Sequence, residues 1–349
     1  MNDTRLEGAR RPDWVFTLLD EADRPLKRLR TVSAWSLDLN PLAQLGDSGS
    51  LTLLVGVEGV DFMRHRVKVS YDPGVEGVDP WGLGVFLFAE PGLDRQETHS
   101  TTRVGLVSKL AVLDDDKLEE SYTVPKGANI VQTVLALVES TGETRVTVTA
   151  SGEYVREPIV FDAGESKLAI VNQLLDAVGY WGITVDGEGV LTSSPYVPPA
   201  ERPVKWEFVE GEHATHSGEW SREQDLTGVP NRVVCRTAGT DEEPALVGVA
   251  LNEDPVSRFS FQARGRWVTR VYDVEATSQA QINAMAQRRL LEAGSPVATV
   301  SVEHAVLPLR PRDLVVLESS PLRVRATVQK LSVVSPGFLM SSELREVPA

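Results

Sequence analysis

A run of small and acidic residues, Gly46-Asp47-Ser48-Gly49-Ser50, has the composition found around nucleophilic serines. A serine nucleophile needs a histidine that takes its proton. The first histidine of the chain, His65, follows this serine, and an apolar strand pattern, Leu51–Val55, stands where a lipase of the Gly-Asp-Ser type would have a helix. These residues therefore predict a turn that leads into a strand, and not an active site.

Four residues of metal-ligand type recur at every third position: Glu210, His213, His216 and Glu219. On a helix this spacing would place them along one side, as a zinc site could use. The glycine, serine and threonine residues between them oppose a helix, and on a strand residues three apart face opposite sides. We therefore expect a solvated polar loop without a metal ion.

Two other motifs fall short of a ligand site. Asp114-Asp115-Asp116 lacks the glycine and the alternating oxygen ligands of an EF-hand loop, which favours an exposed turn. Gly82-Leu83-Gly84 lacks the third glycine and the following helix of a phosphate-binding loop. Carboxylates are plentiful, but no spacing singles out a pair for glycoside hydrolysis. The sequence thus predicts no catalytic residue, no cofactor and no metal ion.

Arginine and aromatic side chains gather in one short segment, Arg264-Gly265-Arg266-Trp267, which follows Arg258, Phe259 and Phe261. These groups could stack on a sugar or on a base. Arginine and aromatic residues are also enriched at protein interfaces. The sequence favours a charged β-hairpin or a subunit contact over a ligand site.

Composition places the 349-residue chain among globular proteins, because 42% of its residues are hydrophobic and 24% are charged. No apolar stretch approaches the roughly 20 residues that span a bilayer. The polar start, Met1–Asp13, predicts no secretory leader. Cys235 is the only cysteine, which excludes an internal disulfide and indicates a reducing cytoplasm.

The net charge of −15 is concentrated in the middle of the chain. Residues 1–109 hold 16 acids and 13 bases, residues 110–225 hold 21 and 8, and residues 226–349 hold 13 and 14. The middle segment therefore carries −13, which repels phosphate and disfavours nucleic-acid binding there.

The pattern of apolar residues divides the chain into three parts. Alternation in Arg66–Tyr71 and Arg103–Leu106 predicts antiparallel strands, and hence a first small β-barrel over 1–114. Two amphipathic helices, starting at Ile130 and Leu168 and each followed by a strand, predict an α+β domain over 115–200.

The proline-rich stretch Pro195–Pro203 is a predicted linker, after which strand patterns resume. They predict a second β-barrel over 201–349. One helix near 277–293 interrupts this barrel, with a capping box at Ser278 and Gln281 and a stop at Gly294 and Pro296. The predicted fold class is therefore mainly β with α+β parts.

The order of several weak motifs resembles the baseplate hub, or tail-tip hub, proteins of tailed phages, above all the minor tail proteins of long-tailed phages. The motifs are, in chain order, Leu45–Leu53, Arg66–Asp72, Leu83–Phe86, Leu110–Lys117, Val124–Ile130, Ala169–Leu175 with Gly179-Tyr180, Val229–Val234 and Pro311–Val315. This resemblance covers nearly the whole chain.

The resemblance implies a homotrimer in which two barrels per chain form a pseudo-sixfold ring between a sixfold tail tube and a threefold tip. Implied partners are tail tube proteins, the tape measure protein, tail-tip fibres or receptor-binding proteins, and passing DNA that is not bound specifically. The implied location is the tail tip of the virion, after assembly in the host cytoplasm. Because the chain ends soon after the strands of the second barrel, we expect a hub without an enzymatic extension.

A different class of function is also compatible with the residues: a tail protein that binds or hydrolyses cell-surface glycans. Its groove would be formed by Arg264–Trp267 or by the acids of 110–225. In the hub, by contrast, the acids would line a DNA channel or solvate the outer rim. They are Asp114, Asp115, Glu119, Asp186 and Glu188. The sequence favours neither the channel wall nor the outer rim for these acids.

Overall fold

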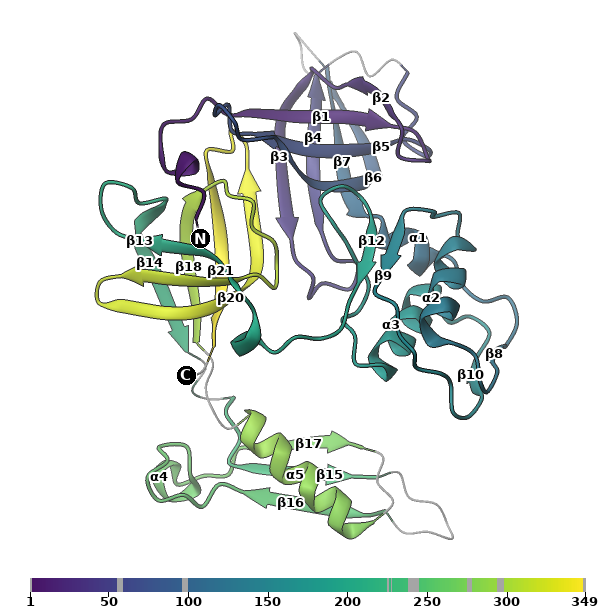
Figure 1. Ribbon diagram of the computed structural model, residues 1–349, viewed down its shortest axis with the longest axis vertical. Helices are drawn as coiled ribbons and strands as arrows, with labels where there is room; N and C mark the ends of the chain where they lie inside the picture. The colour runs from purple at the N-terminus through teal and green to yellow at the C-terminus, as the bar shows by residue number, and fades with distance from the viewer. Residues whose placement is uncertain are drawn as a thin grey trace. The chain divides into compact units, whose positions relative to one another are not determined.

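Antiparallel sheets dominate the computed structural model, which has 44% strand and 16% helix (Figure 1). The structure describes residues 2–54, 59–95, 100–224, 226, 228–237, 245–274, 278–293 and 298–347. These residues form two compact units. Unit 1 comprises Met1–Trp220 and Ser301–Val347, and unit 2 comprises Ser221–Val300. The mainly β fold class predicted from the sequence is confirmed.

The first strands of unit 1 follow a short 3-10 helix, η1 (Thr4–Glu7), and are paired antiparallel in the order β3-β4-β7-β6-β5-β1-β2. Their alternating residues are buried as the sequence predicts, because Val67, Val69 and Tyr71 face the core from one strand and Val104 and Leu106 from another. The strands are β1 (Asp13–Leu19), β2 (Pro25–Arg28), β3 (Val32–Leu39), β4 (Ser48–Leu54), β5 (Arg66–Asp72), β6 (Trp81–Arg95) and β7 (Ser100–Ser108).

The C-terminal strands continue the same sheet. The long strand β20 pairs with β19 through its first half and with β3 through Leu331–Val334, so all 13 strands are connected. Among the described residues no closed barrel is formed, and the two-barrel arrangement stays a prediction. The strands are β13 (Val204–Val209), β14 (His216–Gln224), β18 (Ala298–Ala305), β19 (Leu314–Ser319), β20 (Leu322–Val334) and β21 (Leu339–Glu346).

An α+β segment lies between these two sets of strands. Its helices are α1 (Leu110–Asp115), α2 (Ile130–Glu139) and α3 (Lys167–Ala177), and the last two are the amphipathic helices predicted from the sequence. Asn129 and Ser166 cap their first turns, and Gly142 and Gly179 follow their last turns with φ of +91° and +70°. Their apolar faces share one core with the surrounding short strands.

The short strands of the α+β segment form two small sheets. Strand β8 (Tyr122–Val124) pairs antiparallel with β10 (Ile159–Phe161). Strand β12 (Leu191–Ser193) pairs antiparallel with β11 (Thr184–Val185), with which it forms a hairpin, and parallel with β9 (Val146–Val148). The linker that follows contains a 3-10 turn, η2 (Pro199–Glu201).

Unit 2 is a three-stranded sheet covered by one helix. Its elements are β15 (Arg232–Arg236), β16 (Val247–Leu251), α4 (Phe261–Arg264), β17 (Thr269–Asp273) and α5 (Gln279–Ala293). Ile282, Ala286 and Leu290 of α5 pack on buried residues of β15 and β16. A Cβ on Gly248 would lie 2.6 Å from the Ile282 carbonyl oxygen, so glycine allows this close packing.

Helix α5 is the helix predicted near 277–293. Its predicted stop, Gly294 and Pro296, lies outside the described residues, as does the side chain of Gln281 in the predicted capping box. The division of the chain into domains 1–114, 115–200 and 201–349 stays a prediction.

Candidate functional site

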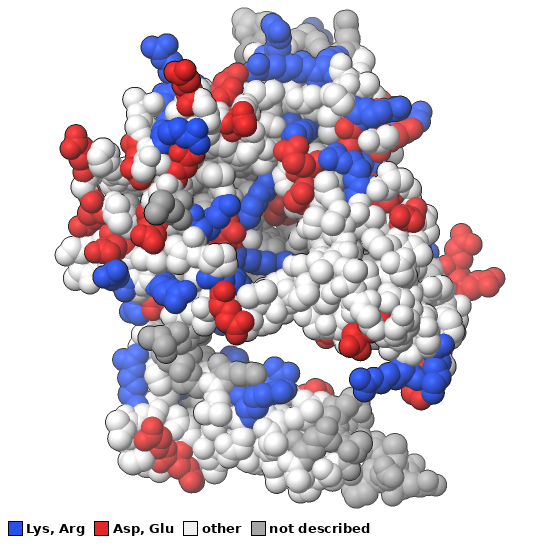
Figure 2. Space-filling view, viewed as in Figure 1, with Lys and Arg blue, Asp and Glu red and all other residues white. Residues whose placement is uncertain are grey.

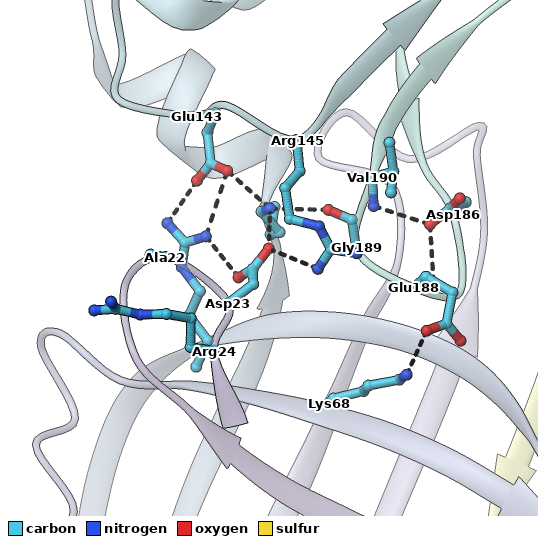
Figure 3. A network of polar contacts seen from close by, with 12 residues as sticks. Ala22, Asp23, Arg24, Lys68, Glu143, Arg145, Asp186, Glu188, Gly189 and Val190 are labelled. Carbon is cyan, nitrogen blue, oxygen red and sulfur yellow. Dashed lines mark hydrogen bonds and ion pairs between the residues drawn. The ribbon is translucent and has the colours of Figure 1, made fainter. Parts of the chain in front are cut away.

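A buried cluster of charged residues joins the first strands to the α+β segment (Figure 3). Asp23 accepts hydrogen bonds from Arg66 Nη1 at 2.8 Å and from Lys109 Nζ at 2.7 Å. Glu143 pairs with the same two cations, at 2.5 Å from Arg66 Nη2 and 2.8 Å from Lys109 Nζ. The side chain of Lys109 is fully buried, and those of Asp23 and Glu143 are 2% and 4% exposed. We call these four residues the Asp23 cluster.

Each member of the Asp23 cluster comes from a different part of unit 1. Asp23 lies in the turn between β1 and β2, where its φ is +60°, and Arg66 begins β5. Lys109 follows β7, and Glu143 lies in the loop between α2 and β9. Burial lowers the pKa of Arg66, but its hydrogen bonds to Asp23 and the charge of Glu143 outweigh burial and raise it. Arg145 Nη1, on a partly exposed side chain, also lies 3.5 Å from Asp23 Oδ2. The two carboxylates therefore pair with two buried cations and with Arg145 at the edge, and they fix the α+β segment on the first strands.

The turn of the β11–β12 hairpin is pressed against the start of β6. A Cβ on Gly82 would lie 2.1 Å from the Gly187 carbonyl oxygen, so the two backbones meet without side chains between them. The Arg310 guanidinium reaches this contact and donates to the carbonyl oxygens of Gly82 at 2.5 Å and Leu83 at 2.8 Å. The Gly82-Leu83-Gly84 motif therefore serves close packing inside strand β6.

Asp47 of the predicted turn lies on the wall of a cavity of about 210 Å³, together with Arg310 and Arg312. Burial raises the pKa of Asp47 to about 6, against the lowering effect of Arg310 and of the hydrogen bond from the Asn40 backbone. Ser48 is exposed and begins β4, and no described histidine is hydrogen-bonded to it. The predicted strand is present, but it already begins at Ser48, so Ser48–Ser50 belong to β4 and not to the predicted turn.

The predicted polar loop at 210–219 is only partly a loop. Glu210 accepts hydrogen bonds from the Ser319 hydroxyl and the Ser320 amide, while His213 and Glu219 are exposed. The expectation of a solvated position is wrong for His216, which begins β14 and is buried with both ring nitrogens unpartnered among the described residues. Its ring packs against Phe208, and His216 is the one buried residue of β14, whose other residues are half-buried or exposed.

A second buried histidine, His304, was missed by the motif search. Its Nε2 lies 2.6 Å from the Ser342 hydroxyl and its Nδ1 lies 2.6 Å from the Ala305 carbonyl oxygen. Burial lowers its pKa to about 4. The sequence contains a signal for this burial. His304 follows Val300 and Val302 at every second position of β18, and alternate residues of a strand face the same side, so all three lie on the core face. Among the described residues no group of His, Cys, Asp or Glu is placed to hold a metal ion.

Two predictions about local structure are corrected. Asp114 and Asp115 end helix α1 and do not form a turn, because Leu110, Ala111 and Leu113 provide a buried helical face. Asp116 caps this helix end, and its carboxylate pairs with Lys167 at 2.6 Å.

The Arg264–Trp267 segment is not a β-hairpin. Arg264 ends the short helix α4, and Gly265 follows it with a φ of +65°. Trp267 stacks on Phe261 with ring centres 4.5 Å apart, and Arg264 donates to the carbonyl oxygen of Val229. Cys235 is buried in unit 2, where burial raises the pKa of its thiol. None of the described helices is long and apolar enough to cross a membrane.

Comparison with solved structures finds similar architecture over almost the whole chain. A tail protein from Neisseria meningitidis is 12% identical with a TM-score of 0.68, over 95% of this chain and 96% of that one. The 43 kDa tail protein of prophage MuSo2 from Shewanella oneidensis is 12% identical with a TM-score of 0.65, over 95% and 98% of the two chains.

The likeness extends to secretion machinery. The c3393 protein of E. coli, described as a component of the type VI secretion system with structural similarity to the T4 tail proteins gp27 and gp5, is 11% identical. Its TM-score is 0.53, over 91% of this chain and 74% of that one. No protein-family model matches the sequence, and no curated protein matches it. The chain therefore shares the fold of these phage tail proteins, which confirms the resemblance drawn from the sequence.

Proposed function

We propose that the chain is a structural protein at the distal end of a phage tail, where it forms the hub that joins the tail tube to the tip. The observation that carries this proposal is the likeness to two tail proteins over 95% of this chain and nearly all of theirs. The proposed role needs no catalytic group. The proposed hub would contact neighbouring proteins through the edges of its sheets and through exposed side chains.

The hub would be a homotrimer that presents six similar β-rich parts, two from each chain. Its two parts would be built on the strands of 1–114 and of 201–349, each closing as a barrel within the ring. Strand β2 supports this arrangement, because it lies at one end of the sheet with all four residues exposed. An exposed edge strand offers unpaired backbone groups to a neighbour, and a closed ring satisfies such contacts.

The partners proposed for the hub are tail tube proteins on one side and fibre or receptor-binding proteins on the other, with the tape measure protein and DNA passing through. The −13 charge of residues 110–225 suits a wall that does not bind DNA. Glu188 pairs with Lys68, and Asp186 accepts hydrogen bonds from the Glu188 and Val190 amides, so both are engaged inside the chain. The exposed Asp115 and Glu119 are better placed to line a channel.

A glycan-binding role at Arg264–Trp267 has less support. Trp267, which is 38% exposed, is stacked by Phe261 and lies under the Arg232 guanidinium at 5.0 Å, so contacts inside unit 2 already occupy part of its ring. Two arginines likewise contact the ring of Phe259. These contacts account for the arginine and aromatic residues of the segment as stabilising groups of unit 2.

The mass of the purified protein tests the hub. Light scattering over a concentration series should show a trimer of about 114 kDa, three times 38.1 kDa. A strict monomer at the highest concentration would contradict the proposal. In a reconstruction of the trimer, Asp115 and Glu119 should face the threefold axis, and an outward orientation with a neutral or basic channel wall would refute the acidic channel alone.

A further inference from the structure

Three adjoining cavities of unit 1 share one residue, Arg312, which lies between β18 and β19. The first is the cavity of about 210 Å³ that contains Asp47, and the others measure about 470 and 510 Å³. Arg202 lines both of the larger ones. Figure 2 shows basic side chains in a hollow of unit 1 between the C-terminal strands and the α+β segment. We call these adjoining cavities the Arg312 groove.

The cations of the Arg312 groove lack carboxylate partners among the described residues. The Arg312 guanidinium lies 4.3 Å from the ring centre of Trp181, and that of Arg202 lies 5.1 Å from the same ring. Arg202 donates to the carbonyl oxygens of Val197 and Arg312, at 2.8 and 2.9 Å, which carry no full charge. Burial lowers the pKa of Arg312 and the charge of Arg202 lowers it further, against a smaller raising effect of Asp47. The guanidinium groups of Arg202 and Arg312 therefore both lie next to the Trp181 ring, and no carboxylate forms an ion pair with either of them among the described residues.

The nearest acids are already engaged. Asp313 Oδ2 accepts a hydrogen bond from the Arg310 amide at 2.8 Å, and burial raises the pKa of its carboxyl. Asp47 accepts one from the Asn40 amide, and its pKa is also raised by burial. Burial therefore disfavours the charged form of both carboxyls.

The backbone of Arg312 is held in an unfavourable conformation. Its φ is +77°, a value that residues with a Cβ rarely adopt. Two hydrogen bonds keep it there, from the Arg312 amide to the Val328 carbonyl oxygen at 2.7 Å and from Arg202 Nη1 to the Arg312 carbonyl oxygen. Strain of this kind is found where side-chain placement serves binding. It directs a cation into the groove at a cost to stability.

Hydroxyl groups line the rest of the largest cavity. Thr147 and Thr149 come from β9 and its end, and Thr192 and Ser194 come from β12 and its end. No hydrogen bond that the structure describes engages these four hydroxyls. They offer donors and acceptors to the hydroxyl groups of a polyol, while a cavity of this size suits a small organic ligand.

We propose that the Arg312 groove binds a phosphate group carried by a polyol or sugar, with Arg202 and Arg312 on the phosphate and the threonine and serine hydroxyls on the polyol. Arginine forks match phosphate oxygens in geometry and charge. The ligand is either a free sugar phosphate or one repeat of a phosphate-linked glycan chain. This binding is independent of the oligomeric state proposed above.

Calorimetric titration with glycerol 1-phosphate, glycerol, inorganic phosphate and poly(glycerol phosphate) tests the groove. Glycerol 1-phosphate should bind, and inorganic phosphate and glycerol should each bind at least about tenfold more weakly because each offers half of the contacts. Tighter binding of the polymer per phosphate identifies a glycan chain as the source, and equal binding identifies the free phosphate ester. No binding of either ester, or equal binding of inorganic phosphate, would overturn the proposal.

The variant Arg312→Gly separates binding from folding. Glycine adopts a positive φ freely, so this change relieves the backbone and should leave the thermal midpoint near that of the unchanged protein. Affinity for glycerol 1-phosphate should fall at least about tenfold. Arg202→Ala should weaken binding in the same way, while Arg325→Ala, which removes an exposed arginine of β20, should not. Undiminished binding by both groove variants would refute the assignment.

Discussion

Unit 1 contains two groups of buried or half-buried cations that differ in their counter-charges. In the Asp23 cluster, Arg66 and Lys109 each contact both Asp23 and Glu143, and solvent is excluded. In the Arg312 groove, Arg202 and Arg312 face an aromatic ring, carbonyl oxygens and an open cavity. This difference in counter-charge indicates two different roles for the buried or half-buried cations. Neutralised cations hold segments of the chain together, whereas cations left with spare charge beside a cavity are available to a ligand.

The two groups also differ in what their removal should do. A buried ion pair adds little stability over an apolar replacement, but removing one partner leaves an uncompensated charge that is very costly. An arginine on the wall of a cavity can be removed while water solvates what remains. Stability should therefore depend strongly on the Asp23 cluster and weakly on the Arg312 groove.

The largest effect should come from Lys109→Met. Methionine fills a similar volume but leaves Asp23 and Glu143 with one buried cation, Arg66, and with the more exposed Arg145 at 3.5 Å from Asp23. We expect a loss of about 3–5 kcal/mol in the free energy of unfolding. Urea-unfolding curves measured at neutral pH provide the test.

A matched control is Lys126→Met, which removes a lysine from an exposed pair with Glu157. Exposed pairs contribute roughly 0–1 kcal/mol, so this variant should unfold close to the unchanged protein. Similar small losses for both lysines would mean that the Asp23 cluster does not fix the α+β segment.

A smaller effect, of opposite sign, is expected from Asp47→Asn on the wall of the groove. The folded-state pKa of Asp47, about 6, lies above that of an unfolded chain, so the folded state binds more protons between about pH 4 and 6. The stability due to this proton is present at low pH and is lost as the pH rises through about 6. Asparagine removes this dependence and should stabilise the protein by about 1–3 kcal/mol at pH 8 and little at pH 4.

Unfolding curves at pH 4, 6 and 8 measure this dependence, and asparagine keeps an oxygen for the hydrogen bond from the Asn40 amide. A gain that is equal at all three values would assign the effect to packing. A loss at pH 8 would mean that the ionised carboxylate is needed to balance Arg310 and Arg312.

The sequence predicts elements whose cause is local. The periodicity that starts at Ile130 and Leu168 marks α2 and α3, and alternation marks β5 and β7, because each pattern lies within one element. The sequence does not predict the Asp23 cluster, because Asp23 and Glu143 are 120 positions apart. It also does not predict the contact between Arg202 and Arg312. Such pairs depend on how segments pack, and only an independent knowledge of the fold brings them together. The prediction of a solvated loop at 210–219 was wrong for His216 for a related reason: its burial depends on packing against Phe208 of β13 and not on the local sequence.

His216 sharpens the comparison between the two groups, because it is buried and its ring nitrogens have no hydrogen-bond partner among the described residues. Burial lowers its pKa, so the unfolded state binds more protons below about pH 6.5 and stability falls as the pH decreases. Phenylalanine has a similar shape and no unpartnered nitrogen, so His216→Phe should raise stability by about 1 kcal/mol at pH 7 and by more at pH 5. Some acid sensitivity should persist, because His304, with a pKa of about 4, acts in the same direction.

The control variant is His213→Ala, which changes an exposed residue and should shift the free energy of unfolding by no more than about 0.5 kcal/mol. If His216→Phe were destabilising at both pH values, the imidazole would have a partner in solution, and His216 would belong with the neutralised groups of the Asp23 cluster.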